Sequence, residues 1–186
     1  MLNVTELRAG IAFEEDGQLY KVLSYDHIKM GRGSASIRVK VKNLRTGAVT
    51  EKSFINGAKV NDASLLRKKY QYLYKDAENA FFMDEVSYEQ IPVSLKGLGD
   101  DSNYLKEGIS VYLLFVEDEA LTLELPPKME FTIAETGPDL RGNSATNIFK
   151  EAILENGLSV RVPLFMKAGE RVIIDTRTGQ YSERAK

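Results

Sequence analysis

Aliphatic and cationic side chains alternate along residues 36–42, which read Ser-Ile-Arg-Val-Lys-Val-Lys. A period of two predicts a β-strand whose aliphatic side chains share one face of a sheet. The opposite face then carries three cations, Arg38, Lys40 and Lys42. An exposed row of like charges repels itself, and an anionic partner relieves that repulsion.

Short runs of the same character recur along the whole chain, separated by turn residues such as Asp-Gly and Thr-Gly. The expected strands lie near residues 11–15, 18–25, 36–43, 49–54, 67–74, 80–84, 109–115, 120–125, 129–135, 148–154, 158–162 and 171–175, with a short helix near 92–98. Such spacing predicts small sandwiches or barrels.

Two interruptions divide this series of strands. Residues 55–66 have few periodic apolar positions, and Pro126 and Pro127 follow one another. Segments of about sixty residues suit five-stranded barrels, including the oligonucleotide-binding (OB) kind. We therefore predict an all-β protein of three small β-barrels in series, with domains at 1–64, 65–127 and 128–186.

Composition places the chain among soluble globular proteins, with 43% hydrophobic and 28% charged residues in 186. Cysteine is absent, so no disulfide framework or thiolate metal site is expected. The N-terminus does not resemble a signal peptide, and the longest apolar run, 111–116, is too short to span a bilayer. These features predict a cytoplasmic protein with no membrane association.

Charge is distributed unevenly along the chain. Residues 1–64 have ten Lys or Arg against seven Asp or Glu, a net charge of +3. Residues 65–127 have six against twelve, a net −6, and residues 128–186 have nine against eight, a net +1. This asymmetry suits a protein that presents some surfaces to phosphate groups and keeps others away from them.

Candidate catalytic groups are few. His27 is the single histidine, and no serine lies in a nucleophile-elbow pattern. The carboxylates at 84–85, 100–101 and 117–119 lack calcium-loop spacing, and Gly97-Leu98-Gly99 lacks the Lys-Ser/Thr of a phosphate-binding loop. We expect no enzyme, no metal and no cofactor.

The connection before the cationic strand reads Lys29-Met30-Gly31-Arg32-Gly33-Ser34-Ala35. Glycine permits backbone angles closed to other residues and close approach to another surface. An arginine between two glycines at the end of a hairpin is able to project from the body of the protein. A plain solvated turn is the alternative reading of these seven residues.

Over its whole length the sequence resembles bacterial elongation factor P. The resemblance is carried, in order, by residues 29–35 and the basic strand, Asn-Leu-Arg-Thr-Gly at 43–47, Phe-Phe-Met-Asp at 81–84, Leu-Glu-Leu-Pro at 123–126, Val-Pro-Leu-Phe at 162–165 and the ending at 174–184. It implies an SH3-like (KOW-like) first barrel, two OB barrels after it, and an elongated, tRNA-like shape.

The resemblance also implies a function. Such a factor binds the 70S ribosome between the P and E sites, contacts peptidyl-tRNA and rRNA as a monomer, and stimulates peptide-bond formation at polyproline stalls. Proline has a fixed φ and places the nascent chain badly, so a factor that only positions the tRNA end lowers the barrier.

Site residues follow from the same resemblance. Arg32 matches the tip residue that points toward the peptidyl transferase centre, within a tip loop of Lys29, Met30, Gly31, Gly33 and Ser34. Arg38, Lys40 and Lys42 are expected to contact phosphates, which position rather than specify. A loop of Arg141, Gly142, Asn143 and Ser144 corresponds to one that reaches the exit-site codon. Tyr181 and Arg184 correspond to a C-terminal RNA contact.

Two of these sites depart from the family pattern. Many members have lysine between the two glycines and extend it with β-lysine, and that chemistry does not apply to Arg32. Rhamnosylation by an arginine-modifying glycosyltransferase and an unmodified arginine both remain open. Asn143-Ser144 stands where many members have Asp-Thr, which removes a negative charge.

Other classes of function also remain open at this point. A free-standing single-stranded nucleic-acid-binding protein would spread basic charge along the chain, and the −6 middle segment argues against it. A hydrolase with an acidic site in the middle barrel would need inward-facing carboxylates. A paralogue of the factor with altered motif preference is a further alternative.

Overall fold

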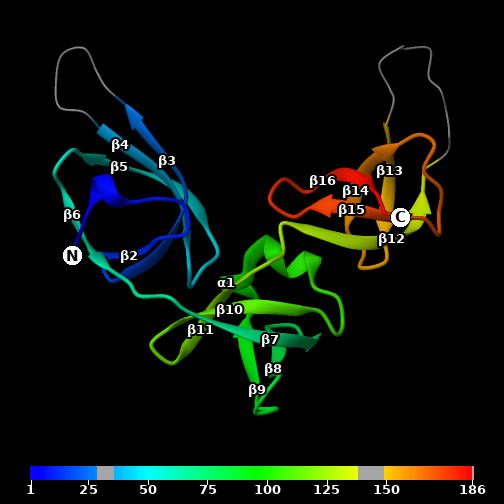
Figure 1. Cartoon of the computed structure of the whole chain (residues 1–186), viewed down its shortest axis with the longest axis horizontal. Coiled ribbons are helices and arrows are strands. Elements are labelled where there is room, and N and C mark those ends of the chain that lie inside the picture. The colour runs from blue at the N-terminus through cyan, green and yellow to red at the C-terminus, as the bar shows by residue number, and fades with distance from the viewer. Residues whose placement is uncertain (29–35, 138–148, 186) are drawn as a thin grey trace. The chain divides into compact units, whose positions relative to one another are not determined.

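The chain folds into three antiparallel β-sheets that follow one another in sequence, shown as a computed structural model in Figure 1. The structure describes residues 1–28, 36–137 and 149–185. It forms two compact units. One contains Met1–Asp100 and Gly108–Glu124, and the other contains Asp101–Glu107 and Leu125–Lys186.

The first sheet has six strands in the order β1-β6-β2-β3-β4-β5. Its elements are β1 (Leu2–Asn3), a 3-10 turn (Val4–Glu6), β2 (Ala12–Glu15), β3 (Gln18–Ile28), β4 (Ser36–Asn43), β5 (Val49–Ile55) and β6 (Lys59–Asp62). The β2–β3 hairpin closes through Asp16 and Gly17, which both have positive φ, as the expected Asp-Gly turn requires.

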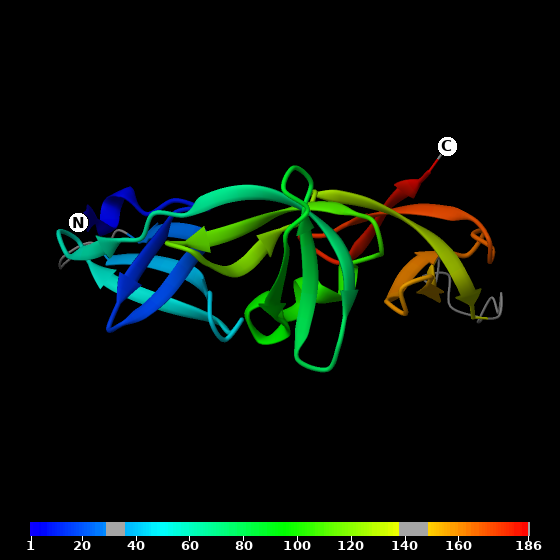
Figure 2. The ribbon, with the colours of Figure 1, turned by 90° about the horizontal axis from the view of Figure 1, so that it is seen from below.

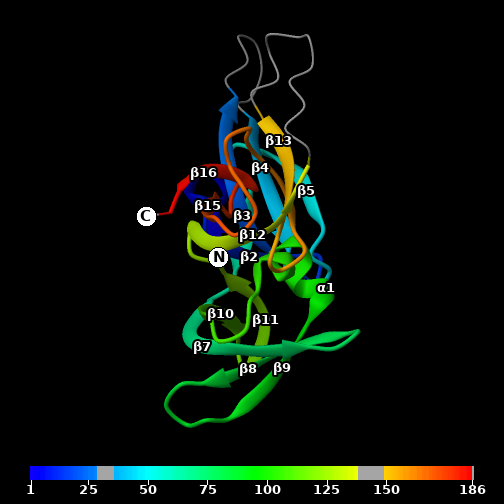
Figure 3. The same cartoon turned by 90° about the vertical axis from the view of Figure 1, so that its right-hand side faces the viewer.

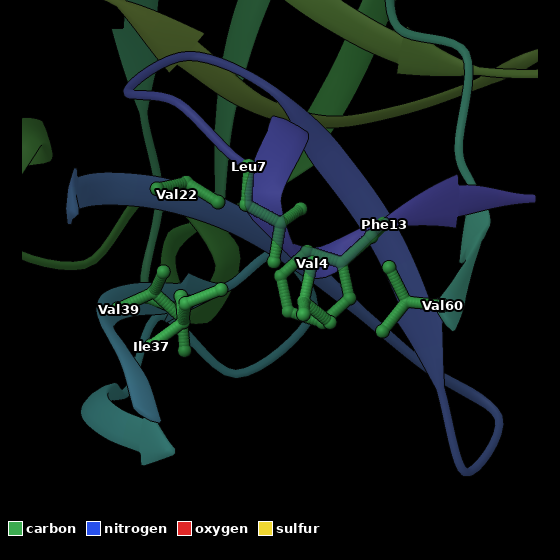
Figure 4. Close-up of a cluster of buried hydrophobic side chains, with 8 residues drawn as sticks. Val4, Leu7, Phe13, Val22, Ile37, Val39 and Val60 are labelled. Carbon is green, nitrogen blue, oxygen red and sulfur yellow. The ribbon is translucent and has the colours of Figure 1, made fainter. Parts of the chain in front are cut away.

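The core of this sheet is a cluster of fully or nearly fully buried aliphatic side chains around Phe13 (Figure 4). Its members come from the 3-10 turn, the residue that follows it and four strands: Val4, Leu7, Phe13, Val22, Ile37, Val39, Val41 and Val60. Strand β4 supplies the alternate residues Ile37, Val39 and Val41, so its period of two in the sequence becomes one buried face.

The middle sheet has the order β11-β10-β7-β8-β9. Its first strand along the chain, the long β7, is strongly curved (Figure 2). Its elements are β7 (Leu66–Lys75), β8 (Asn79–Asp84), β9 (Gln90–Ser94), a short helix α1 (Leu95–Leu98), a 3-10 turn (Gly99–Tyr104), β10 (Ser110–Val116) and β11 (Glu119–Glu124). Its aromatic core includes Tyr72 packed edge-on against Phe82, with ring centroids 5.6 Å apart.

The last sheet has the order β14-β13-β12-β15-β16. Its strands are β12 (Lys128–Thr136), β13 (Phe149–Leu154), β14 (Ser159–Pro163), β15 (Arg171–Asp175) and β16 (Gln180–Arg184). If the strands of each sheet are numbered 1 to 5 along the chain, the middle sheet has the order 5-4-1-2-3. The last sheet has the same order when it is read from β16 to β14. In both, the third strand also lies near the fifth, as in a five-stranded barrel, although these two strands end the hydrogen-bonded order of their sheet.

The predicted all-β class with three small sheets in series is therefore confirmed. The domain boundaries at 64 and 127 remain predictions. The elongated, tRNA-like shape also remains a prediction.

Several predicted elements need correction. Residues 59–62 and 180–184 form strands where none was expected. The helix expected over 92–98 begins at Leu95, because residues 90–94 form β9. Pro92 misled the prediction: β9 ends its sheet, and an edge strand tolerates a residue that cannot donate to a neighbour.

Candidate functional site

The β3–β4 hairpin presents the end of the first sheet at which the functional tip was predicted. β3 and β4 run side by side toward the end of their hairpin, as Figure 3 shows, and the last described pair is Ile28 with Ser36. The predicted tip residues Lys29, Met30, Gly31, Arg32, Gly33 and Ser34 lie outside the described residues. The structure therefore describes the base that carries the tip.

Strand β4 shows the predicted alternation. Ile37, Val39 and Val41 are fully buried, while Arg38 and Lys40 are exposed on the opposite face. These two cations lie on the strand that follows the tip connection, and Arg38 is three residues after Ala35, where that connection ends.

Carboxylates surround these two cations. Asp26 lies opposite Arg38 on β3, and Glu51 lies opposite Lys40 on β5. The Nε atom of Arg38 is 3.9 Å from an Oε2 of Glu51. The expected self-repulsion of a purely cationic face is thus relieved within the protein, and this surface is mixed in charge.

Lys42 corrects the prediction of an exposed row of three cations. Lys42 is only 9% exposed, and its Nζ atom donates a 2.8 Å hydrogen bond to the carbonyl oxygen of Leu98. Leu98 is the last residue of α1, which connects strands of the middle sheet. The alternation correctly assigned the face of the strand. It did not show that part of that face is covered by another segment of the chain.

The predicted C-terminal contact residues lie on β16. Tyr181 is half-buried opposite Ile174, and the exposed Arg184 forms a 2.8 Å ion pair with Glu170. The Arg184 side chain is 61% exposed, whereas that of Glu170 is 23% exposed. The predicted loop of Arg141, Gly142, Asn143 and Ser144 lies outside the described residues, between β12 and β13.

The carboxylates of the 84–85 turn do not have the properties of a general acid. Asp84 accepts hydrogen bonds from the backbone N–H groups of Ser87 and Val86, which lowers its pKa. Hydrogen bonds from Ser110 and then Lys69 lower the pKa of Glu85. Asp84 therefore holds the turn, and Glu85 joins the turn to β10 and β7. Neither carboxylate has the raised pKa that a general acid at neutral pH needs.

Two further absences concern the described parts of the chain. Within residues 1–28, 36–137 and 149–185, no group of His, Asp and Glu side chains is arranged to hold a metal ion. No helix in the same residues has the length and apolar character needed to cross a membrane. His27 is exposed near the end of β3, opposite Ile37.

Sequence reasoning missed a charged contact between the first and middle sheets and the contacts within the middle sheet that support it. Glu124 accepts a 2.8 Å hydrogen bond from Lys21 and lies 2.9 Å from the Nε of Arg67. The guanidinium of Arg67 lies 3.8 Å from the ring centroid of Tyr112. Lys21 and Glu124 are 103 residues apart, and no local pattern pairs residues at that separation.

Comparison with known proteins matches each of the three sheets. The elongation factor P KOW-like domain matches residues 3–60, the elongation factor P OB domain matches 65–123, and the C-terminal domain of elongation factor P matches 129–184. Elongation factor P of Moorella thermoacetica is 43% identical over 185 residues, which cover 100% of both chains. That of Clostridium botulinum strain Hall is 43% identical over 99% of this chain and 100% of its own.

Among solved structures, eukaryotic translation initiation factor 5A from Methanococcus jannaschii is similar over 65% of this chain and 86% of its own, at 22% identity and a TM-score of 0.46. That likeness is too low to carry an argument. The three sheets and their matches define a multidomain translation elongation factor. The chain belongs to the elongation factor P family.

Proposed function

We propose that this protein binds the 70S ribosome between the P and E sites and stimulates peptide-bond formation at polyproline stalls. The observation that carries the proposal is the family match, which extends over the full length of the chain at 43% identity. The Gly-Arg-Gly tip sequence at 31–33, which connects β3 to β4, supports it.

The proposed mechanism is positioning. Consecutive prolines hold the nascent chain in a poor geometry for attack because their φ angle is fixed. A protein that clamps the end of peptidyl-tRNA in a near-attack geometry removes part of the entropic barrier without an acid, a base or a covalent step. The proposed role for the protein is therefore non-enzymatic, with chemistry left to the ribosome.

The residues proposed for this role divide into two groups. Arg32 is the tip group, and its planar guanidinium offers several donors to RNA oxygens. Arg38 and Lys40, exposed behind the tip, are the proposed phosphate contacts. Lys42 is not carried into this group because its ammonium is buried against Leu98.

Translation of a Pro-Pro-Pro reporter in a purified system, with and without the protein, tests the proposal. The wild type is expected to relieve the stall, and Arg32→Ala is expected to lose most of that relief. Arg161→Ala, which removes an exposed arginine on β14, is the matched control and should keep full activity. Equal stalling with wild type, Arg32→Ala and no protein would contradict the proposal.

The state of Arg32 is a separate question with its own measurement. The intact mass of the protein from its native host, followed by the mass of the 29–35 peptide, distinguishes a rhamnosylated from an unmodified arginine. An added deoxyhexose mass on this peptide would show rhamnosylation and so imply an arginine-modifying glycosyltransferase. An unmodified peptide would show that the arginine acts with its own fixed charge.

The proposed exit-site contact consists of residues 141–144, and the proposed C-terminal RNA contact consists of Tyr181 and Arg184.

The rival class of function is a free-standing single-stranded nucleic-acid-binding protein, which would bind isolated oligonucleotides with strong salt dependence. We expect only weak binding of free RNA, because the middle segment carries a net charge of −6. Tight oligonucleotide binding without ribosome binding would favour the rival.

A further inference from the structure

The turn between β4 and β5, Asn43-Leu44-Arg45-Thr46-Gly47, has no role in the function proposed above. Its own geometry is tightly held. The Oδ1 atom of Asn43 accepts hydrogen bonds from the backbone N–H groups of Arg45 and Thr46, at 2.9 and 3.0 Å. Gly47 donates to the carbonyl oxygen of Asn43 at 2.9 Å and has a φ of +73°. A side chain therefore locks this turn in one conformation.

This rigid turn lies directly against the backbone of the middle sheet's helix. A Cβ atom added to Gly47 would be 2.3 Å from the carbonyl oxygen of Lys96 and 3.3 Å from the Cα of Gly99. A Cβ added to Gly97 would be 2.4 Å from the carbonyl oxygen of Leu121 and 3.0 Å from that of Leu44. Glycine permits backbones to approach this closely, so Gly47 is required by the contact between the two sheets. Gly97 is required mainly by the packing of α1 on β11 within the middle sheet, and its approach to Leu44 adds a tight contact across the sheets.

Neighbouring side chains reinforce the same contact. Leu44 is fully buried, although it lies in a turn at the end of its sheet. The buried ammonium of Lys42 donates to the carbonyl oxygen of Leu98, the last residue of α1. Arg45 and Glu119 pair through two contacts, at 3.1 and 3.0 Å. The Nζ of Lys21 on β3 lies 2.8 Å from the Oε1 of Glu124 on β11, so this ion pair also joins the first and middle sheets.

We propose that the Asn43–Gly47 turn is a positioning element that holds the first and middle sheets as one rigid body and so fixes the direction of the β3–β4 hairpin. Both sheets lie in one compact unit, as this role requires. The inference rests on the proposed function, because a factor that works by positioning needs a rigid connection behind its tip. A displacement of about 1 Å at a reacting group is enough to cost on the order of 100-fold in rate.

Distances between spin labels test the rigid connection directly. The chain has no cysteine, so Asn56→Cys on the first sheet's exposed turn and Ser87→Cys on the middle sheet's exposed turn give one defined pair. Pulsed electron resonance on the full chain is expected to show a single narrow distance distribution. Gly47→Ala is expected to broaden it at least twofold, because the added methyl group overlaps a backbone carbonyl.

Gly17→Ala is the matched control. Gly17 has a φ of +70°, close to that of Gly47, lies in the same sheet, and has no atom within 4 Å of an added Cβ. Its substitution imposes the same backbone strain without the overlap, and the distribution should stay narrow. An unchanged distribution in folded Gly47→Ala, or equal broadening in Gly17→Ala, would overturn the proposal.

A second pair of variants decides the matter if Gly47→Ala does not fold. Lys42→Met keeps the aliphatic stem and removes the ammonium that reaches Leu98, and it should broaden the distribution. Lys40→Met, two residues away on the exposed face of the same strand, should not. Identical distributions for these two variants would count against the proposal.

The Pro-Pro-Pro reporter separates the two levels of the argument. Gly47→Ala is expected to lose stall relief by on the order of tenfold or more, while Gly17→Ala keeps it. If the wild type relieves no stall, the proposed function fails and the distances alone decide whether the sheets are held together. If Gly47→Ala loosens the sheets but relieves stalls fully, the positioning role fails and the proposed function stands.

Discussion

The tripeptide Arg-Thr-Gly occurs twice, at 45–47 between β4 and β5 and at 177–179 between β15 and β16. The two turns have the same backbone geometry. In each, the glycine has a positive φ, +73° and +72°, and its N–H donates to the carbonyl oxygen two residues before the arginine. In each, that earlier residue also accepts a backbone N–H with its side chain.

The turns differ in what lies against them. Gly47 faces the backbone carbonyl of Lys96, whereas Gly179 faces the hydroxyl group at the end of the Tyr104 side chain. The accepting residue also differs: it is the buried amide of Asn43 in the first turn and the carboxylate of Asp175 in the second. One local motif therefore serves both as a docking element and as a simple hairpin turn, and its surroundings decide which.

Substitution of the two glycines should separate the turns most strongly. Alanine in the left-handed region of the backbone costs roughly 1–2 kcal/mol. We expect about this loss of unfolding free energy for Gly179→Ala, because the Tyr104 hydroxyl that an added methyl group would meet is the end of a side chain and moves a few tenths of an ångström easily. Gly47→Ala adds an overlap with backbone that costs roughly 1–3 kcal/mol more. Chemical denaturation measures both. Equal losses would show that the surroundings do not matter.

Exchange of the residues whose side chains accept the backbone N–H groups, Asn43 and Asp175, should change the unfolding free energy less, and the two changes should depend on pH in different ways. Hydrogen bonds from Arg177 lower the pKa of Asp175 from 3.8 to about 2. Because the folded-state pKa is the lower one, this carboxylate stabilises the fold fully above about pH 4, and that stabilisation is lost as the pH falls toward 2. With Asp175→Asn, the stability of the last sheet should depend less on pH in the acid range. Unfolding measured between pH 5 and 2 tests this.

The reciprocal change, Asn43→Asp, places a carboxylate where the amide is 9% exposed. It should destabilise the protein by about 1–3 kcal/mol at pH 7 and less in acid, because burial disfavours the charged form. Acid sensitivity that is unchanged in both variants would contradict the assignment of these roles.

The arginines of the two turns should matter least for stability. Arg45 pairs with Glu119 across the sheets at about half exposure of both side chains. A double-mutant cycle on Arg45 and Glu119 should give a coupling below about 1 kcal/mol that falls as salt is added. A larger, salt-insensitive coupling would show that this ion pair, and not the glycine contact, holds the sheets.

Much of this fold could be predicted from local patterns. The alternation along β4 predicted both its strand and its buried face, and Glu15-Asp16-Gly17 predicted a turn between the strands that became β2 and β3. Strand β9 was missed because Pro92 is a poor strand residue everywhere except at an edge. Strand β16 was missed because its polar residues lack alternation: four of its five are exposed.

The sequence by itself determined the all-β class, the three successive sheets, the family and the place of the Gly-Arg-Gly connection, because these depend on periodicity, turn residues and ordered motifs within short stretches. Only the tertiary structure decided that Lys42 is buried against Leu98 and that the Asn43–Gly47 turn packs on α1. Lys42 and Leu98 are 56 residues apart. Their contact arises from how two sheets pack together, and no local pattern records that packing.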